Sequence, residues 1–293
     1  MVNADILLSL VLIGIFGGTV YGLLAVGLSL QISVCRVLNV THGEFLMLGA
    51  VLTFAFSQLG INPLLAPVII GPLLFGLGFL LQATLFRGVK ARARSPAAFE
   101  GNALLAAFGL MYIILNLARI KWGTVTLPSH YLTSSVPFSG INIQLNLIVG
   151  FAIAAILGIA VYLFLTRSRL GRAIRATAED QPTAELMGVN TNIMLALCFG
   201  LGALLAGVAG TLISLRTDVD TSIGFNNTVI ALIVVTLGGL GSVTGSFIAG
   251  IIIGIVSMLV AGLWRQSILI VPVYYAMLMI LLLVRPTGIL GKK

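Results

Sequence analysis

The chain has 293 residues, of which 59% are hydrophobic and 8% are charged, and its formal net charge is +8. Soluble domains carry about 25% charged residues, so this composition is typical of a polytopic membrane protein and leaves little room for a water-soluble domain. In such a protein, excess Lys and Arg indicates basic cytoplasmic loops rather than nucleic-acid binding. Cys35 and Cys198 lie in or beside apolar runs, which argues against a disulfide scaffold.

Apolar runs that could cross a bilayer recur along the chain, a crossing that takes about 20 helical residues. The first run carries no charge between Asp5 and Arg36, and it is too long for the core of a signal peptide, so we expect a retained span. Its small residues predict close packing on another helix; they are Gly14, Gly17, Gly18, Gly22 and Gly27. The predicted spans cover residues 6–30, 45–58, 64–86, 101–118, 146–166, 191–215 and 266–284.

Two of the connections are distinctive. Residues 87–94 form a basic loop, and residues 119–144 form the longest polar connection, with candidate short strands at 124–127 and 141–143. The long connection contains Pro128 and His130 and is either a docking surface for an extracytoplasmic partner or a solvated connector.

The segment 221–264 is free of charge for longer than one helix requires. Its middle, Leu237-Gly-Gly-Leu-Gly-Ser-Val-Thr-Gly245, is a poor helix core, so the segment is either one tilted span or two shorter helices that meet at a glycine turn. The broken, re-entrant form (residues 229–260) keeps Arg285, Lys292 and Lys293 on the side of the other basic loops, as the positive-inside tendency requires. We therefore predict an all-α polytopic membrane protein with about eight membrane segments, an outer N-terminus and a cytoplasmic C-terminus.

Residues 167–190 form a strongly charged segment between two apolar spans. We expect a short helix over 181–187, because Asp180 can cap it, Pro182 suits its first turn and Gly188 can end it in the left-handed conformation. This helix is either presented to a partner or is part of a solvated loop. The charged residues are Arg167, Arg169, Arg172, Arg175, Glu179, Asp180 and Glu185.

The sequence His42-Gly43-Glu44 stands at the predicted start of the second span. It could line or gate a translocation route. The alternative is an interfacial helix start, in which Asn39 or Thr41 caps the helix and Glu44 complements the helix dipole or pairs with Arg36.

Motifs of catalysis and of ion coupling are missing from the sequence. There is no phosphate-binding G-x-x-x-x-G-K-[ST] loop, no nucleophile–base arrangement, and only two histidines for a metal. Acidic residues within the spans, which usually carry proton or sodium coupling, are nearly missing too. We therefore expect no enzyme, no cofactor and an external source of coupling energy.

The chain resembles, nearly end to end, the inner-membrane permease of branched-chain amino-acid ABC transporters, of the high-affinity Leu/Ile/Val type. Four motifs carry the resemblance: residues 18–28 with the run Leu38-Asn-Val-Thr-His-Gly-Glu-Phe-Leu-Met-Leu-Gly49, the run Leu170-Gly-Arg-Ala-Ile-Arg-Ala176 with Ala184 and Gly188-Val-Asn190, the glycine run 237–245, and Arg285-Pro-Thr-Gly288. The chain departs from the family pattern at Val40-Thr41 and at Pro182, which leaves the substrate open.

The resemblance implies a single permease domain over 1–293, in a bacterial inner membrane, in which 167–190 is a coupling loop that contacts an ATPase. It implies two ATPase subunits, a second permease or another copy of this chain, and a periplasmic binding protein that docks on the outer loop 119–144. The implied polar contacts are Arg172, Arg175, Glu179 and Asp180, with Ala184, Leu186 and Met187 as the packed face and Gly188 at the end of the helix. Candidate path or gate residues are Asn39, His42, Gly43, Glu44, Gly238, Gly239, Gly241 and Ser242.

Two other functions are consistent with the residues. One is an ATP-independent channel or carrier for a small neutral solute such as urea or an amide, which low intramembrane charge suits. The other is a structural membrane subunit. The charged segment 167–190 favours the importer over both.

Overall fold

The computed structural model describes residues 4–124, 126–128, 131–138, 141–264, 267–285 and 287–291. Among these residues, six helices are long and apolar enough to cross a membrane, and two shorter apolar helices accompany them. The prediction of a helical polytopic membrane protein is confirmed, while the number of crossings stays a prediction. Several residues named above lie outside the described residues: His130, Pro286, Lys292 and Lys293.

The long helices follow the predicted apolar runs, with ends shifted by a few residues. They are α1 (Ala4–Leu30), α2 (His42–Gln58), α3 (Ala66–Leu81), α5 (Pro96–Trp122), α6 (Leu145–Arg167), α9 (Thr191–Ser214), α10 (Ile223–Gly238), α11 (Val243–Trp264) and α12 (Ile270–Val284). Short elements join them: α4 (Arg87–Arg92), α7 (Arg169–Glu179), α8 (Gln181–Leu186), the π-helical turns Gln31–Cys35 and Gln82–Phe86, and the 3-10 turns Pro63–Leu65 and Ser267–Leu269.

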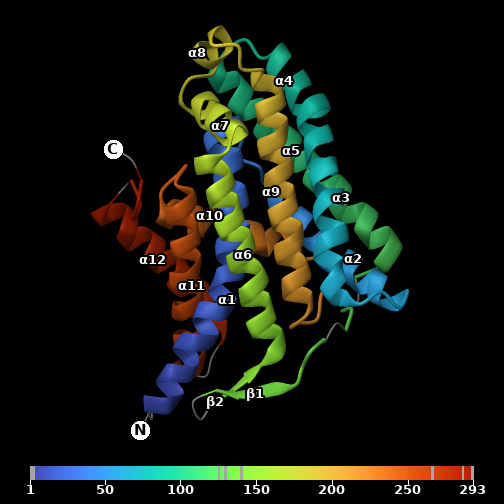
Figure 1. The fold of residues 1–293 in the computed structure, drawn as a ribbon, viewed down its shortest axis with the longest axis vertical. Helices are drawn as coiled ribbons and strands as arrows, with labels where there is room; N and C mark the ends of the chain where they lie inside the picture. Colours follow the sequence, from blue (N-terminus) through green and yellow to red (C-terminus); the bar gives the residue numbers. More distant parts are fainter. Residues whose placement is uncertain are drawn as a thin grey trace.

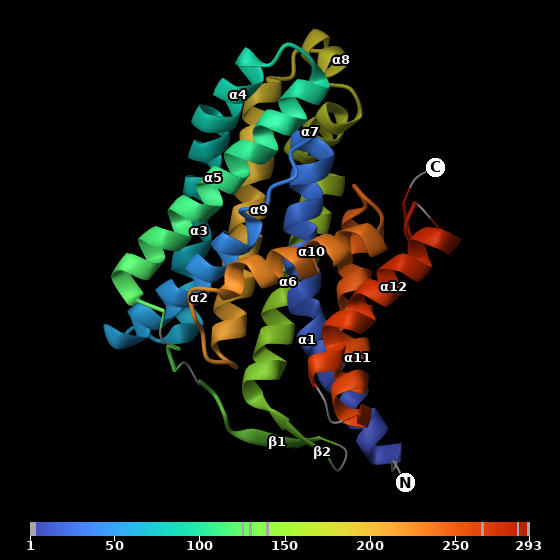
Figure 2. The ribbon, with the colours of Figure 1, turned by 180° about the vertical axis from the view of Figure 1, so that it is seen from behind.

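The molecule has two distinct ends. α4, α7 and α8 gather at one, which we call the α7–α8 end, and the N-terminus and the β1–β2 hairpin gather at the other, the hairpin end (Figure 1). α1, α6 and α9 run between the two ends. Seen from behind, α10 crosses the middle of the molecule obliquely before α11 turns toward the hairpin end (Figure 2).

The hairpin belongs to the long connection between α5 and α6. β1 (Ser135–Phe138) and β2 (Ile141–Gln144) pair antiparallel, with Ser135 opposite Gln144. The strand expected at 141–143 is therefore confirmed. The one expected at 124–127 is not a strand in the residues described there, 124 and 126–127, since Leu127 forms an isolated bridge to Val219 instead.

Two segments predicted as loops are largely helical. The basic stretch 87–94 continues the preceding helix as α4, and α5 then begins at Pro96 under an N-cap in which Ser95 Oγ accepts from Ala98 N at 3.1 Å. The segment 167–190 holds α7 as well as the expected short helix. In both places, charged residues obscured a helix that packs on its neighbours through a few apolar positions.

The charge-free segment 221–264 is broken at its glycine-rich middle, as predicted. α10 ends at Gly238, and Gly239 and Gly241 take φ values of 100° and 88°, which a residue without a Cβ adopts at little cost. Ser242 then caps α11, because its Oγ accepts from Gly245 N at 3.1 Å. The two helices extend beyond the predicted segment 229–260 at both ends.

α1 and α11 pack closely along an antiparallel seam of small residues. A Cβ on Gly14 would lie 2.6 Å from Ile255 Cα, one on Gly18 would lie 2.8 Å from Gly250 O, and one on Gly250 would meet the backbone of Gly22. The expectation that this face of the first span packs on protein is therefore confirmed. Gly17 lies off the seam and faces Arg216.

We predict that Gly250→Ala destabilises the protein by about 1–3 kcal/mol, because the added methyl group forces α1 and α11 apart. The matched control is Gly76→Ala on α3, where no atom outside the local helix lies within 4 Å of the added Cβ. That change should be neutral or stabilising by up to about 1 kcal/mol. Thermal unfolding of both variants in detergent measures this, and equal melting temperatures would contradict the close seam.

Candidate functional site

The short helix α8 has the capping expected of it. Asp180 Oδ2 accepts from Thr183 Oγ1 at 2.6 Å, and Asp180 Oδ1 accepts from Thr183 N at 3.4 Å. Pro182 lies in the first turn, and Gly188 follows the helix with a φ of 84°. The sequence between α7 and α9 therefore encodes a defined helix with both ends satisfied.

α7 precedes α8 and lies directly against the end of α6. Ser168 Oγ caps α7 by accepting from Gly171 N at 2.8 Å. A side chain on Gly171 would meet Phe164 O and the backbone of Leu165, so the two helices touch through their backbones. Ile174 and Thr177 are buried beneath α7 while its charged side chains are exposed. This one-sided burial, with glycine at the contact, fixes the direction of α7.

Side-chain hydrogen bonds fasten the α7–α8 pair to three other elements. Gln181 Nε2 donates to Val34 O in the turn after α1 at 3.2 Å, and Lys90 Nζ of α4 donates to Gln181 Oε1 at 2.6 Å. Arg36 Nη2 donates to Ala178 O at 3.3 Å. On the other side, Thr191 Oγ1 at the start of α9 donates to Glu185 Oε1. α8 is therefore bonded directly to the turn after α1, to α4 and to the start of α9.

The apolar residues of α8 divide into one that is buried and two that are exposed. Leu186 and Met187 are 88% and 81% exposed, whereas Ala184 is 4% exposed. Ala184, which the resemblance groups with Leu186 and Met187 as the packed face toward the ATPase, instead packs within its own chain. Leu186 and Met187 form an exposed apolar pair at the tip of the α7–α8 end.

The charged residues predicted for the coupling segment lie on this same surface. Arg172, Arg175, Glu179 and Asp180 are all exposed. Arg175 and Glu179 line a cavity of about 430 Å³ together with Gly241. The structure thus brings a part of the predicted coupling segment next to the glycine-rich turn, although the two are far apart in sequence.

A second cavity, of about 540 Å³, lies where α7 meets α8, and it shares Ala178 and Glu179 with the first. Glu179 and Asp180 line it from α7 and α8, and Arg36, Lys90 and Arg94 line it from the turn after α1 and from α4. Charges of both signs therefore line this cavity, at the same end of the molecule as the exposed apolar pair.

The second group of candidates, at the start of α2, is buried inside the molecule. Asn39, His42 and Glu44 are 0%, 0% and 1% exposed. Thr41 Oγ1 donates to Ala107 O at 2.7 Å, and Ala107 lies about 16 Å along α5 from its start at the α7–α8 end. The prediction of an interfacial helix start is therefore wrong: α2 begins inside the protein, after a non-helical stretch at residues 36–41.

The capping and pairing proposed for this stretch also differ from the structure. Thr41 occupies the N-cap position without a side-chain cap, and Asn39 Oδ1 accepts from Thr41 N at 3.1 Å. Arg36 lies away from the buried Glu44, because its side chain is exposed and donates to Ala178 O. Among the described residues, Glu44 Oε2 has no hydrogen-bond partner.

Hydrogen bonds hold the buried stretch to its neighbours. We call the residues that make these bonds the joint: Gln31, Asn39, His42, Gly43 and Thr228. Asn39 Nδ2 donates to Gln31 Oε1 at 2.9 Å, and His42 Nε2 donates to Leu24 O at 2.9 Å. Thr228 Oγ1 of α10 accepts from Gly43 N at 2.9 Å and donates to Val40 O at 3.1 Å. Gly43 has no room for a side chain, because a Cβ there would meet Gly224 O.

The glycine-rich turn is held by the end of the chain. Ile289 N donates to Leu237 O at 2.9 Å, and Leu290 N donates to Gly238 O at 3.1 Å. Gly238 and Gly239 are buried beneath this contact, while Gly241 is exposed and Ser242 is half-buried. The predicted path or gate residues therefore fall into two separate groups, one at the joint and one at the glycine-rich turn. α10 runs between the two groups.

Sequence reasoning did not single out α7, Gln31, Gln181 or Thr228. The signal for α7 was a serine cap with apolar residues four apart, at Leu170 and Ile174. The partners of Gln31, Gln181 and Thr228 lie 147 to 188 residues away, apart from the contacts with Asn39, Lys90 and Gly224, so no local pattern marks the distant ones. No group of three or more His, Cys, Asp or Glu that could hold a metal is present in the described part of the chain.

Comparisons with known proteins agree on one family. The family model described as "Branched-chain amino acid transport system / permease component" matches residues 10–284. The chain is 32% identical to the high-affinity branched-chain amino acid transport system permease protein LivH of Salmonella typhimurium and to LivH of Escherichia coli K12, and 29% identical to BraD of Pseudomonas aeruginosa. Each comparison covers 95% of this chain and 94% of the relative. No solved structure matches.

The fold and these sites define a multi-pass membrane permease built from long helices and from helices that begin or end inside the protein. The chain belongs to the family of branched-chain amino acid transport system permease components. It is accordingly a transport component and not an enzyme.

We predict that Gln181→Leu loosens α8, because it removes the bonds to Val34 and Lys90. The loss of about 1–2 kcal/mol should speed amide exchange in α8 by about 5–30-fold. Hydrogen–deuterium exchange of the purified protein measures the change. Gln58→Leu, at the exposed end of α2, is the control and should leave α8 as it is. Unchanged exchange in the Gln181 variant would mean that these bonds do not hold α8.

Proposed function

We propose that this chain is the permease subunit of an ATP-driven importer of branched-chain or related small amino acids. The importer would comprise this chain, a second permease or another copy of it, two ATPase subunits and a periplasmic binding protein. The permease family supports this assignment, because the matching relatives are named as permease proteins of high-affinity branched-chain amino acid transport systems.

The observation that carries the proposal is the exposed pair Leu186 and Met187 at the tip of the α7–α8 pair. Exposed large apolar side chains at one projecting point, with charges of both signs beside them, are typical of a protein–protein contact. α8 is fastened to α1, α4 and α9, so a partner that binds there is mechanically connected to the membrane helices. We assign the ATPase to this surface, with Arg172, Arg175, Glu179 and Asp180 as its polar contacts.

This assignment sets the orientation of the chain in a bacterial inner membrane. The α7–α8 end would face the cytoplasm, together with the basic residues of α4, Arg36 and the end of the chain, as the positive-inside tendency requires. The hairpin end, with the N-terminus, would face outward. The β1–β2 hairpin and the rest of the outer connection 119–144 would then meet the binding protein.

The test is a pair of charge substitutions at the tip. Leu186→Glu with Met187→Glu should reduce recovery of co-expressed ATPase subunits with the tagged permease by about tenfold or more, because central apolar contacts dominate interface energies. ATP-dependent uptake of labelled leucine into proteoliposomes should fall in parallel.

Leu59→Glu is the matched control, since Leu59 is 75% exposed at the hairpin end of α2. It should leave ATPase recovery unchanged. Full recovery of the ATPase with the double variant would contradict the assignment of this surface to the ATPase. Leucine uptake without ATP would instead support the channel or carrier hypothesis.

A further inference from the structure

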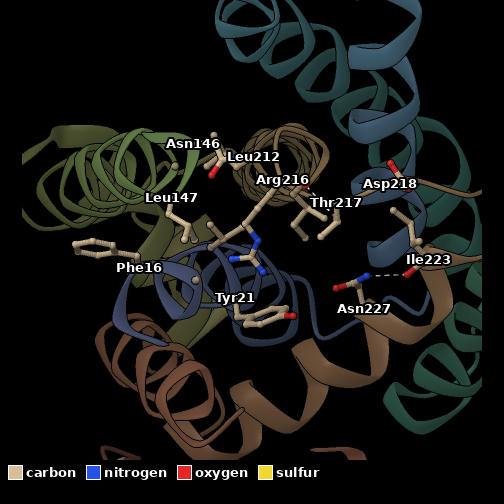
Figure 3. A pocket seen from close by; sticks show the side chains of 14 residues that line it. Phe16, Tyr21, Asn146, Leu147, Leu212, Arg216, Thr217, Asp218, Ile223 and Asn227 are labelled. Carbon is tan, nitrogen blue, oxygen red and sulfur yellow. Dashed lines mark hydrogen bonds between the residues drawn. The ribbon is translucent and has the colours of Figure 1, made fainter. Parts of the chain in front are cut away.

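Toward the hairpin end, the structure has a cavity of about 180 Å³ that the sequence did not indicate. The middle of α1, the first turns of α6, the end of α9 and the start of α10 surround it (Figure 3). Sites for drug-sized ligands measure roughly 300–1,000 Å³, so this cavity suits a smaller solute.

A positively charged group occupies the middle of the cavity. The guanidinium of Arg216, just beyond α9, points between α1 and α10, close to Tyr21 (Figure 3). Its Nη1 lies 3.0 Å from where a Cβ on Gly17 would be, so the absence of a side chain on Gly17 leaves room for it. Within the described part of the chain, no side-chain hydrogen bond or ion pair of Arg216 is found. An arginine offers five N–H donors, and an unpaired one beside membrane helices indicates a ligand.

An unpaired acceptor lies in the same cavity. Asn146 is 3% exposed, and its Nδ2 donates to Leu215 O at 3.2 Å and to Tyr131 O at 3.3 Å. Its Oδ1 is buried without a partner among the described residues. Because buried polar atoms are nearly always hydrogen-bonded, this oxygen also indicates a missing donor.

The rest of the lining is mixed. Asn227 donates from Nδ2 to Ile223 O at 2.9 Å, and its oxygen end points toward Arg216 (Figure 3). Asp218 lines the cavity from an exposed position. Phe16, Leu147 and Leu212 supply apolar walls. The cavity thus offers a cationic donor, amide acceptors and an apolar surface within a small volume.

We propose that this cavity binds the transported solute as a zwitterionic amino acid. The carboxylate would accept hydrogen bonds from the Arg216 guanidinium, and the ammonium group would donate to Asn146 Oδ1. The aliphatic side chain would lie against the apolar walls. This rests on the proposed function, and it adds that the permease itself recognises the amino-acid backbone. A carboxylate from a docking protein is the rival occupant, but the guanidinium lies over α1 within a recess that suits a single small molecule.

The first test uses the complete complex in proteoliposomes, with binding protein and ATP. Arg216→Gln should lower uptake of labelled L-leucine by about tenfold or more, since a hydrogen bond to a charged group is lost. Recovery of the ATPase subunits and of the binding protein should not change. Arg216→Lys should retain part of the uptake. Gln58→Leu, which changes an exposed polar side chain at the end of α2, outside both the cavity and the connection 119–144, should transport as the wild type does.

The second test uses the purified permease alone. Millimolar L-leucine should raise the melting temperature of the wild type but not of Arg216→Gln, and L-leucinamide, which lacks the carboxylate, should not raise it. Gly17→Leu, which fills the cavity, should abolish both this shift and uptake.

The outcomes separate the two proposals. Wild-type uptake in Arg216→Gln would overturn the site, and so would loss of binding-protein recovery in that variant, which would place Arg216 at a protein contact. Absence of ATP-dependent uptake in the wild type would instead overturn the proposed function, while the melting shift with leucine would still test the cavity.

Discussion

The structure depends on satisfying backbone groups where helices break inside the protein. In a bilayer, a free N–H or C=O group has no water to bond, so breaks are tolerated where protein supplies partners. Thr228 does this for the start of α2: its hydroxyl accepts from Gly43 N and donates to Val40 O. The end of the chain does the same for the end of α10, through the bonds of Ile289 and Leu290 to Leu237 and Gly238.

Thr228 lies in the first half of α10, and Leu237 and Gly238 lie at its end. α10 therefore joins the joint at the start of α2 to the turn beside α7, where Gly241 shares a cavity with Arg175 and Glu179. The bonds of α8 run to the turn after α1, to α4 and to α9, whereas the turn after α10 meets α7 across that cavity. This arrangement requires no charge relay in the bilayer, which agrees with the scarcity of acidic residues in the spans.

Much of this architecture could be predicted from the sequence, because its signals are local. Apolar length predicted the long helices, four glycines in nine residues predicted the break before α11, and Asp180, Pro182 and Gly188 predicted α8. What could not be predicted depends on distant partners. The buried position of His42 follows from Leu24, and the burial of Ala184 follows from packing within its own chain. Arg216 looked like part of a short charged loop until the fold placed it over Gly17.

The proposed ATPase contact requires that the α7–α8 end faces the cytoplasm. Because the native cysteines are buried, the side that this end faces can be measured directly with introduced cysteines. Cys35 and Cys198 are 2% and 0% exposed, so a membrane-impermeant maleimide should react with introduced cysteines alone. Met187→Cys should be labelled in inside-out vesicles and not in intact spheroplasts, and Ser135→Cys on the hairpin should show the opposite pattern. Labelling of Met187→Cys from outside the cell would contradict the claim that this surface meets a cytoplasmic ATPase.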